Sequence, residues 1–389
     1  MESQNRTLTI LGSTGSIGIQ TLQVLESSAD KFNLGFITAN SKIDVLEEQA
    51  IKYNPVGVAV SDEKFYNEFK NRTNFKGKIL CGREGVLEAA SYDKNDMVFS
   101  ALVGFSGVKP TLAAINSSKT VALANKETLV SAGSIITTAA KEKNVPIIAV
   151  DSEHSAILQC LVGESIESVE KIILTASGGP FWTTPEEEFE SLSVEQALEH
   201  PNWSMGNKIT IDSATMINKG FEVIEAHWLF GLQINKIEVL IHPQSIVHSM
   251  VQFIDGSVKA QLGIPDMRIP ISYALNYPRR MKYNFPRLEL SEIGILTFEM
   301  PDYFRFPCLK LAYDAIEKGG SATAVLNAAN EIAVYAFLEN RISITQIASL
   351  IEKALNKIKI IAQPTLDEII ESDKETRLYV ESLINEINK

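Results

Sequence analysis

Cysteine is scarce in this chain of 389 residues, which contains only three. Cys81, Cys160 and Cys308 are widely separated, and their spacing matches neither a disulfide framework nor a cysteine metal site. We therefore expect the protein to work in a reducing compartment, without disulfide bonds.

Positive charge is also in short supply, because 36 Lys and Arg residues face 48 Asp and Glu residues, for a net charge of −12. This balance argues against nucleic acid or an anionic membrane as the main partner, although a local cluster of donors could still bind a small anion. No apolar run is long enough to span a bilayer. The first residues lead directly into an apolar segment instead of a secretory or transit sequence, so we expect a cytoplasmic protein of a prokaryote.

Apolar segments of strand length alternate with helical patterns along the first 150 residues. The expected strands lie at 7–11, 34–38, 56–60, 78–81, 97–103, 120–124 and 145–150. Strands separated by helices predict a doubly wound parallel sheet. Because 389 residues exceed what one hydrophobic core usually serves, further domains are expected after this sheet.

A glycine-rich turn follows the first expected strand and precedes a segment with helical spacing. The turn consists of Gly12, Ser13, Thr14, Gly15, Ser16, Ile17 and Gly18. Strand, glycine turn and helix together are the context of a dinucleotide-binding motif, in which the pyrophosphate sits on the helix N-terminus. The motif favours a Rossmann-like cofactor domain over residues 1–150, and the alternative is a plain tight turn.

The end of the second expected strand bears on the choice of nicotinamide cofactor. A site for NAD would place Asp or Glu here to bind the ribose 2′-hydroxyl. The chain instead reads Ala39, Asn40, Ser41 and Lys42, which tolerates a 2′-phosphate. NADP is therefore favoured, although the same residues also fit a polar loop before the next helix.

Asp151 and Glu153 follow the last strand of the series, at the edge where ligands bind in open α/β sheets. On extended backbone, two carboxylates one residue apart point to the same side, which suits a hard cation such as Mg²⁺ or Mn²⁺. The alternative is a helix cap followed by a first-turn glutamate. Lys126 follows the preceding strand, where it can hold a substrate hydroxyl or the cofactor, or simply lie exposed on a helix.

The segment 151–276 changes character and offers loops for a substrate. Ser177 stands in a turn of small residues, which suits phosphate capture or is an ordinary turn. The loop that carries His200, Trp203 and Met205 has large side chains between Pro and Gly, as a lid that excludes water would. The alternative is a loop that packs its tryptophan onto the domain.

An expected strand at 209–211 leads into a helix that is rich in polar residues, with Asp212 or Ser213 as its cap. Three of these residues can bind an anion, namely Ser213, Asn218 and Lys219. Two carboxylates, Glu222 and Glu225, can complete a metal site. Taken alone, the same residues fit a solvated helix face.

The remaining sequence completes the predicted fold. Asp255 and Gly256 between two apolar runs predict a β-hairpin, prolines mark a linker, and the C-terminal part has helical periodicity. We predict an α/β protein with a Rossmann-like doubly wound parallel sheet (1–150), an α+β catalytic and connective domain (151–276), a linker (277–302) and a small all-α domain (303–389).

Six stretches, in this order and spacing, resemble those of the 1-deoxy-D-xylulose 5-phosphate reductoisomerase family. They read GSTGSIG (12–18), LANKE (123–127), VDSEHS (150–155), SGGPF (177–181), HPNWSMG (200–206) and DSATMINKG (212–220). The resemblance implies NADPH-dependent conversion of 1-deoxy-D-xylulose 5-phosphate to 2-C-methyl-D-erythritol 4-phosphate in the non-mevalonate isoprenoid pathway. The carbon skeleton rearranges to an aldehyde, which hydride from NADPH then reduces. The family is typically homodimeric and uses Mg²⁺, Mn²⁺ or Co²⁺.

The resemblance also implies a role for each site residue. Asp151, Glu153 and Glu222 hold the metal, and Lys126 and His200 are further catalytic residues. Substrate contacts are expected from Ser152, Glu153, Ser177, His200, Trp203, Met205, Ser213, Asn218, Lys219 and Glu222. Cofactor contacts are expected from residues 12–18 and 39–42 and from Asn125, Lys126, Glu127, Gly206 and Met267.

The chain departs from the family after the second strand, where many members have Gly-Lys-Asn in place of Asn40, Ser41 and Lys42. Lys42 is therefore expected to reach the 2′-phosphate from one position later. The main alternative function is another NADP-linked, metal-dependent reductase of a small phosphorylated carbonyl compound. Examples of such a reductase are a semialdehyde or a homoserine dehydrogenase. A semialdehyde dehydrogenase would need a cysteine nucleophile, but Cys81, Cys160 and Cys308 all lie inside apolar segments. A non-catalytic NADP-sensing module is a further alternative, and it would have no use for three separated carboxylates.

Overall fold

The computed structural model describes residues 5–27, 32–199, 203 and 205–387, and the chain divides into two compact units. Unit 1 consists of Met1–Thr128, Ile136–Ser155 and Asp266–Phe285. Unit 2 consists of Leu129–Ile135, Ala156–Pro265 and Pro286–Lys389. The finer division at residues 150, 276 and 302 stays a prediction.

A seven-stranded parallel sheet in the order β4-β3-β2-β1-β5-β6-β7 forms the centre of unit 1. Its strands are β1 (Arg6–Leu11), β2 (Phe32–Ala39), β3 (Gly57–Val60), β4 (Lys78–Cys81), β5 (Met97–Ser100), β6 (Thr120–Leu123) and β7 (Ile147–Ala149). Because the order runs outward in both directions from β1 and β5, the topological switch point lies between these two strands.

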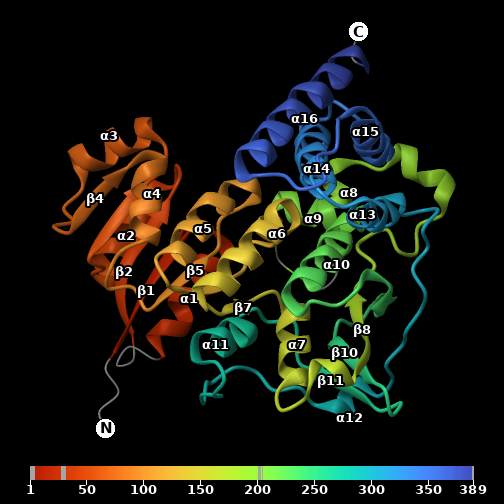
Figure 1. Cartoon of the computed structure of the whole chain (residues 1–389), viewed down its shortest axis with the longest axis horizontal. Coiled ribbons are helices and arrows are strands. Elements are labelled where there is room, and N and C mark those ends of the chain that lie inside the picture. The colour runs from red at the N-terminus through yellow and green to blue at the C-terminus, as the bar shows by residue number, and fades with distance from the viewer. Residues whose placement is uncertain (1–4, 28–31, 200–202, 204, 388–389) are drawn as a thin grey trace. The chain divides into compact units, whose positions relative to one another are not determined.

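Helices connect the strands of this sheet and cover it (Figure 1). They are α1 (Ser16–Glu26), α2 (Ile43–Tyr53), α3 (Glu63–Arg72), α4 (Gly82–Ala90), α5 (Val108–Asn116), α6 (Lys126–Lys143) and α11 (Arg268–Asn276), with a 3-10 turn η2 (Gly104–Gly107). All residues of β3 and β5 are buried, as expected for strands that are covered on both faces. The predicted doubly wound sheet is thereby confirmed.

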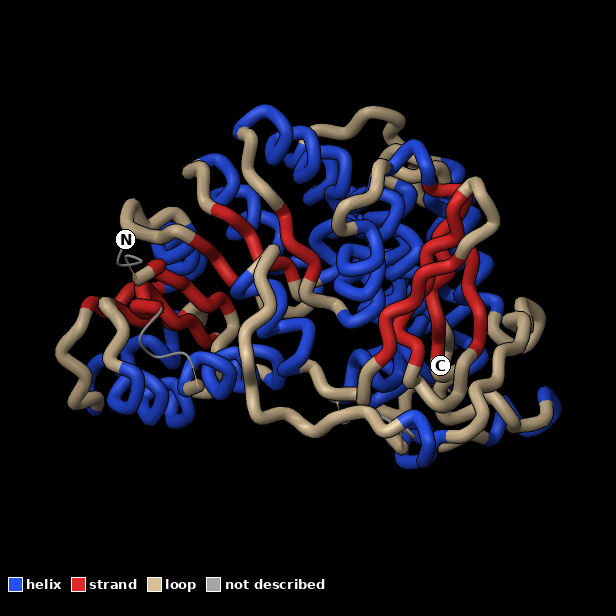
Figure 2. Tube along the Cα trace, turned by 90° about the horizontal axis from the view of Figure 1, so that it is seen from below, coloured by secondary structure: helices blue, strands red, loops and turns tan. Residues whose placement is uncertain are grey.

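Unit 2 contains a smaller, mixed sheet in the order β11-β10-β8-β9 (Figure 2). Its strands are β8 (Val169–Ala176), β9 (Ile237–Ile241), β10 (Val247–Phe253) and β11 (Val258–Leu262). β10 pairs antiparallel with β8 and β11, whereas β9 runs parallel to β8. The hairpin predicted at Asp255 and Gly256 is confirmed, and it places β11 at the edge of the sheet.

Helices make up the rest of unit 2 and build its hydrophobic core. They are α7 (Ser152–Leu161), α8 (Val194–Ala197), α9 (Asn207–Ala214), α10 (Ile217–Phe230), α12 (Leu290–Ile293), α13 (Pro307–Lys318), α14 (Ala322–Leu338), α15 (Ile344–Lys357) and α16 (Leu366–Ile387), with 3-10 turns η3 (Ile166–Ser168), η4 (Glu186–Ser191) and η5 (Ile234–Lys236). α10 packs on α13 and on the strands β8 and β9, so it lies between the C-terminal helices and the sheet (Figure 1). The predicted helical C-terminal region is confirmed.

One local prediction was wrong, because residues 209–211 lie in α9 and not in a strand. The β-branched pair Ile209 and Ile211 favours a strand locally. Lys208 and Asp212, however, form an ion pair one helical turn apart, and α9 packs on α14. Tertiary contacts therefore override the local preference.

No helix in the described ranges has an apolar stretch that is long enough to cross a membrane.

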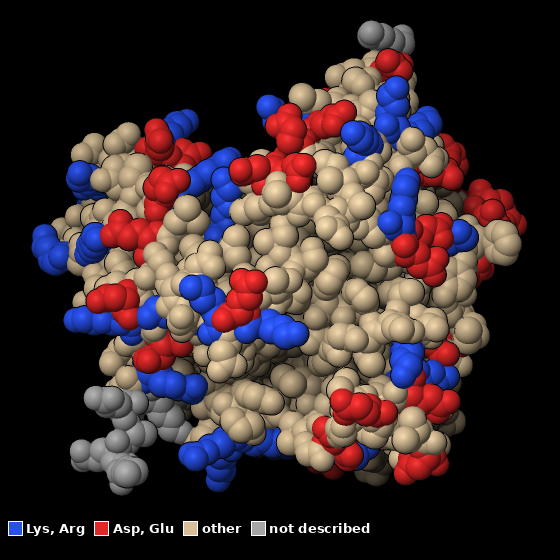
Figure 3. Space-filling model, in the orientation of Figure 1, with Lys and Arg blue, Asp and Glu red and all other residues tan. Residues whose placement is uncertain are grey.

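Charged side chains separate into exposed pairs and a few buried ones. Figure 3 shows Lys and Arg interspersed with Asp and Glu over the drawn face of the molecule. Pairs such as Lys52–Glu26 in unit 1 are exposed to water. Exposed pairs add little to stability. Buried pairs between Lys and carboxylates carry a desolvation penalty, so each such pair is a candidate for a functional or positioning role.

Candidate functional site

The glycine turn of unit 1 brings the backbone of β1 close to the end of β5. Gly12 has a φ of +84°, and a Cβ there would lie 2.6 Å from the carbonyl oxygen of Ala101. A Cβ on Gly18 would lie 2.3 Å from the carbonyl oxygen of Gly12. Both positions therefore require glycine, and the N-terminus of α1 opens at the switch point of the sheet, where an anion is favoured.

A backbone hydrogen bond to the end of β2 brings the residues after β2 close to this turn. The amide of Ser13 donates to the carbonyl oxygen of Thr38 at 2.9 Å. Asn40 accepts a hydrogen bond of 2.6 Å from the Ser61 hydroxyl, and Lys42 is exposed directly before α2. Lys42 is thus the only cation of the four residues 39–42.

Lys126 and Asp151 meet at the carboxyl end of the parallel sheet. β6 and β7 pair side by side, so the residues that follow them lie close together. Lys126 Nζ lies 2.6 Å from Asp151 Oδ2, and only 6% of Lys126 is exposed. Burial alone would raise the pKa of Asp151, but the charge of Lys126 and the nearby His154 ring hold it below its usual range. Lys126 is therefore not the exposed helix lysine of the alternative interpretation.

Asp151 and Glu153 are held at the N-terminus of α7. The amide of Ser152 donates to Asp151 Oδ1 at 3.0 Å, and the Ser152 hydroxyl donates to Glu153 Oε2 at 2.5 Å. Glu153 lies in the first turn of α7, so the expected extended backbone at this residue was wrong. The helix N-terminus itself brings the two acidic groups together and stabilises their charge.

Asn125 caps α6 and links the ends of two neighbouring strands. Its Oδ1 accepts from the Thr128 amide at 3.0 Å, and its Nδ2 donates to the carbonyl oxygen of Leu102 at 2.7 Å and to Glu127 at 3.2 Å. These contacts fix the start of the helix that carries Lys126. Met267, the other expected neighbour of the cofactor, is half-buried directly before α11.

In unit 2, the loop after β8 packs against the end of α9. A Cβ on Gly179 would lie 2.6 Å from the carbonyl oxygen of Ser213, and the amide of Gly179 donates to Ser177 Oγ at 3.2 Å. The structure thereby joins the loop of Ser177 to the helix of Ser213, and both serines are half-buried. Exposed amides and hydroxyls in such a loop suit an oxyanion.

The first turns of α10 carry the other polar residues of the expected site. Asn218 Nδ2 donates to Glu222 Oε1 at 2.6 Å, Lys219 pairs with the other oxygen of Glu222, and Lys219 Nζ donates to the carbonyl oxygen of Thr175 at 2.5 Å. Glu222 is 1% exposed. The expectation of a solvated helix face is therefore wrong.

The predicted cap of this helix was also wrong. α10 begins at Ile217, after Met216 in the left-handed conformation with a φ of 62°, whereas Asp212 and Ser213 belong to α9. Between the two helices the chain therefore turns sharply, and Ser213 lies only five residues before Asn218.

Part of the expected lid lies within the described residues. The Trp203 ring is 6.2 Å from the His248 ring, and both Trp203 and Met205 are half-buried. Gly206 is exposed and directly precedes α9. His200 lies outside the described residues. The contact of Trp203 with His248 fits the alternative of a loop that packs its tryptophan onto the domain.

Sequence reasoning missed several buried polar residues of unit 2. His248 lies beside Trp203 and has no motif around it. Lys208 Nζ lies 2.7 Å from Asp212 Oδ2, and Asn330 Nδ2 of α14 donates to Asp212 Oδ1 at 2.9 Å. The spacing of Lys208 and Asp212 is a helical signal that was available, but nothing in the sequence links Asn330 to either residue.

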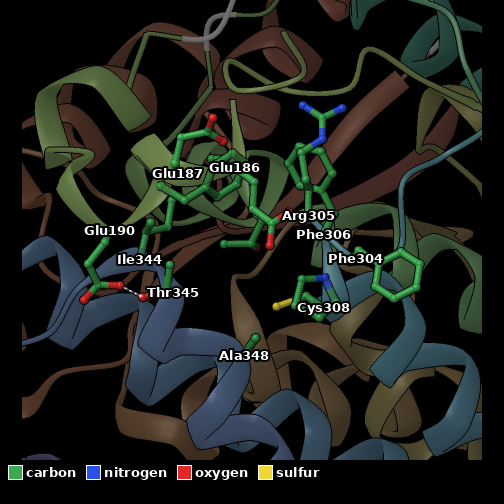
Figure 4. Close-up of a pocket in the computed structure, with 14 residues that line it drawn as sticks. Glu186, Glu187, Glu190, Phe304, Arg305, Phe306, Cys308, Ile344, Thr345 and Ala348 are labelled. Carbon is green, nitrogen blue, oxygen red and sulfur yellow. Dashed lines mark hydrogen bonds between the residues drawn. The ribbon is translucent and has the colours of Figure 1, made fainter. Parts of the chain in front are cut away.

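A cavity of about 520 Å³ opens elsewhere in unit 2, where η4 faces the start of α15 (Figure 4). Phe304, Arg305 and Cys308 line it with Glu190, whose carboxylate accepts a hydrogen bond from Thr345. Burial and the nearby charge of Asp212 raise the pKa of Cys308 to about 12, so this thiol stays protonated at neutral pH. None of the expected site residues lines this cavity.

Comparisons with known proteins match this chain along almost its whole length. Three family models match, described as 1-deoxy-D-xylulose 5-phosphate reductoisomerase (residues 8–133), its C-terminal domain (147–230) and the DXP reductoisomerase C-terminal domain (262–379). The 1-deoxy-D-xylulose 5-phosphate reductoisomerase of Geobacillus sp. (strain WCH70) is 53% identical over 97% of this chain and 99% of its own length. That of Chloroherpeton thalassium is 52% identical over 96% of this chain and 97% of its own length.

Solved structures that resemble this chain along its length belong to the same enzyme family as these relatives. 1-deoxy-D-xylulose 5-phosphate reductoisomerase from Zymomonas mobilis in complex with NADPH is 43% identical, with a TM-score of 0.91 over 98% of this chain and 99% of that chain. DOX-P reductoisomerase in complex with NADPH, fosmidomycin and magnesium is 40% identical, with a TM-score of 0.94 over 98% of both chains. Identity at this level over the full length shows that the chain belongs to the 1-deoxy-D-xylulose 5-phosphate reductoisomerase family.

Proposed function

We propose that this protein converts 1-deoxy-D-xylulose 5-phosphate to 2-C-methyl-D-erythritol 4-phosphate in isoprenoid biosynthesis, with NADPH and a divalent metal. The observation that carries the proposal is the full-length identity of about half with relatives of that name. The buried polar residues of both units supply the chemistry that such a reaction needs. The proposed location is the cytoplasm.

Asp151, Glu153 and Glu222 are the proposed metal ligands. Their carboxylate oxygens are the hard donors that Mg²⁺, Mn²⁺ or Co²⁺ accepts. When bound, the metal would act as a Lewis acid on the ketone and the adjacent hydroxyl of the substrate. Lys126 pairs with Asp151, and its charge holds the pKa of that carboxyl below its usual range, while Lys219 pairs with Glu222.

Residues 1–150 are the proposed NADPH-binding domain, and bound NADPH supplies the hydride. The glycine turn at Gly12 and Gly18 receives the pyrophosphate on the N-terminus of α1. Lys42 is the proposed contact of the 2′-phosphate, because it is a cation at the position where an NAD site would have an acid. Met267 is proposed to lie beside the nicotinamide.

The chain's own side chains bind and orient the substrate in this proposal. Its phosphate is bound by hydroxyl, amide and ammonium donors, namely Ser177, Ser213, Asn218 and Lys219. Lys126 and Ser152 hold substrate hydroxyls at the carboxyl end of the parallel sheet. Residues 151–276 form the catalytic and connective domain, in which His200, Trp203 and Met205 cover the substrate and exclude water.

The test is oxidation of NADPH by the purified protein with 1-deoxy-D-xylulose 5-phosphate, with and without a divalent cation. We expect turnover only when substrate, NADPH and metal are all present. Turnover that survives exhaustive chelation would remove the metal from the proposal. No turnover with Mg²⁺, Mn²⁺ or Co²⁺ would contradict the proposed reaction.

A homodimer is the proposed assembly, as is typical of the family. The part of the expected linker (277–302) that belongs to unit 2 exposes large apolar side chains, of which Leu290 is 56%, Ile295 73% and Met300 72% exposed. The strand β11 also lies at the edge of its sheet, where a strand of a second chain can pair. Exposed apolar side chains that gather in one segment commonly mark a protein interface.

Sedimentation of the wild type and of the double variant Ile295→Asp/Met300→Asp tests this assembly. We expect a dimer for the wild type and a monomer for the variant, because two buried charges at an interface are costly. A wild type that sediments as a monomer would contradict the dimer. A variant that remains dimeric would move the interface away from this segment.

A further inference from the structure

α9 joins two parts of the proposed substrate site in unit 2. Residues 203–206 precede it, and Ser213 lies in its last turn. The carbonyl oxygen of Ser213 lies against Gly179 in the loop of Ser177. A displacement of α9 would therefore move two proposed phosphate donors at once, so the contacts that fix α9 bear on substrate binding.

A buried network around Asp212 holds α9 in place. Lys208 in the first turn pairs with Asp212 in the last turn, and its Nζ also lies 5.3 Å from the centre of the Phe221 ring. Asp212 is 1% exposed, and its second oxygen accepts the hydrogen bond from Asn330 on α14. A buried carboxylate requires such donors, because water cannot replace them.

The C-terminal end of α9 borders a cavity, so packing supports it less than the hydrogen-bonded network does. Ala214 and Thr215, which directly follow Ser213, line the cavity of about 520 Å³ in unit 2. Figure 4 shows this cavity between η4 and the start of α15. A helix end beside a cavity has fewer atoms in contact than one in a filled core. The hydrogen bond from Asn330 to Asp212 therefore stabilises the position of α9, which packing fixes only in part.

We propose that Asn330 is a positioning residue for the substrate phosphate. By binding Asp212, it fixes Ser213 and the loop of Ser177 in the geometry that accepts a phosphate monoester. The inference rests on the proposed function and extends it to a helix of the C-terminal region, because the partner of Asn330 lies 118 residues earlier in the chain.

Asn327 provides a matched control on the same helix. It lies one turn before Asn330, and both residues are 0% exposed. Neither polar atom of the Asn327 side chain has a hydrogen-bond partner in the part of the chain that the structure describes. A change to leucine is thus the same substitution at both positions, but only at position 330 does it remove a donor to Asp212.

The experiment compares Asn330→Leu with Asn327→Leu by steady-state kinetics. For Asn330→Leu we expect the KM for 1-deoxy-D-xylulose 5-phosphate and the inhibition constant of inorganic phosphate to rise about tenfold. We expect its kcat and its affinity for NADPH to stay near those of the wild type, because the phosphate contributes binding that is equal in ground and transition state. For Asn327→Leu we expect all four quantities to stay within about twofold of the wild type.

Equal KM values for the two variants would overturn the inference, as would a change in thermal stability or kcat without a change in KM. If Asn330→Leu does not fold, Asn330→Ala tests the same contact, since it removes the same donor without adding an apolar side chain and should raise KM in the same way. The double variant Asp212→Asn/Asn330→Asp restores one carboxylate and one amide, so it should recover part of the lost affinity. No recovery would contradict a direct contact. A wild type that does not turn over the substrate would instead refute the proposed function.

Discussion

The two units offer two kinds of proposed anion site. In unit 1 the proposed site is made of backbone, because Gly12 and Gly18 let β1, β5 and α1 approach closely and place the N-terminus of α1 at the switch point of the sheet. In unit 2 the proposed site is made of side chains from three separate segments, and Ser213 and Lys219 represent two of them. The first site therefore depends on the absence of a Cβ, and the second on the fixed positions of distant helices.

This difference predicts different sensitivities to mutation. A backbone site tolerates changes of side chains around it but not an added methyl group at its glycines. A side-chain site loses one donor at a time, and each loss is moderate unless a charge is left unpaired. Changes at the metal ligands should exceed both, because they act on the reacting atoms themselves.

Glu222→Gln should have the largest effect. The substitution keeps the size of the side chain but removes a negative charge that we assign to the metal, so kcat should fall about 10²-fold. The metal concentration for half-maximal activity should rise, and NADPH binding, measured by fluorescence, should stay unchanged. Glu225→Gln is the matched comparison, because Glu225 is equally buried one turn later on α10, and its loss should be smaller. Unchanged activity of Glu222→Gln would remove Glu222 from the site.

Gly18→Ala should come next and act on unit 1. Its Cβ would lie 2.3 Å from the carbonyl oxygen of Gly12, so the turn must shift, at a cost of about 1–3 kcal/mol in the free energy of unfolding. A thermal melt and an NADPH titration measure the two consequences. For Gly15→Ala the corresponding distance is 3.5 Å, an ordinary contact, so its stability should equal that of the wild type. Equal melting temperatures for both variants would mean that the turn is not as tightly packed as the distances indicate.

Ser213→Ala should have a moderate effect in unit 2. It removes one hydroxyl donor and leaves no charge unpaired, so the KM for the phosphorylated substrate should rise about fivefold with little change in kcat. NADPH affinity, which we assign to unit 1, should not change. A loss in kcat with constant KM would place Ser213 at the reacting atoms and not at the phosphate.

The difference between a backbone site and a side-chain site also explains which parts of the candidate site the sequence could predict. The backbone site of unit 1 lies within seven consecutive residues between a strand and a helix, so local pattern identifies it. Lys126 and Asp151 follow two strands that pair, so sheet topology brings them together. Asn330 has no such signal, because its contact with Asp212 exists only after α9 and α14 have packed.

Local preference also misled at two places in the chain. The β-branched residues at 209–211 favour a strand, but buried contacts of Lys208 and Asp212 stabilise a helix. Glu153 was expected on extended backbone, but α7 begins one residue earlier. In both cases a helix terminus near the site sets the geometry of the functional groups, and its exact position depends on tertiary contacts that a local pattern does not contain.

Lys42→Ala should have the smallest effect and sharpen the comparison in unit 1. If the glycine backbone supplies most of the binding, an exposed lysine adds only a screened attraction to the 2′-phosphate, so the KM for NADPH should rise about threefold. The effect should fade at high salt, and the KM for NADH should not change, because NADH has no 2′-phosphate. Lys70→Ala, at another exposed lysine of unit 1, serves as the control for net charge. An equal loss with NADH and NADPH would show that Lys42 supports the loop after β2 and does not read the 2′-phosphate.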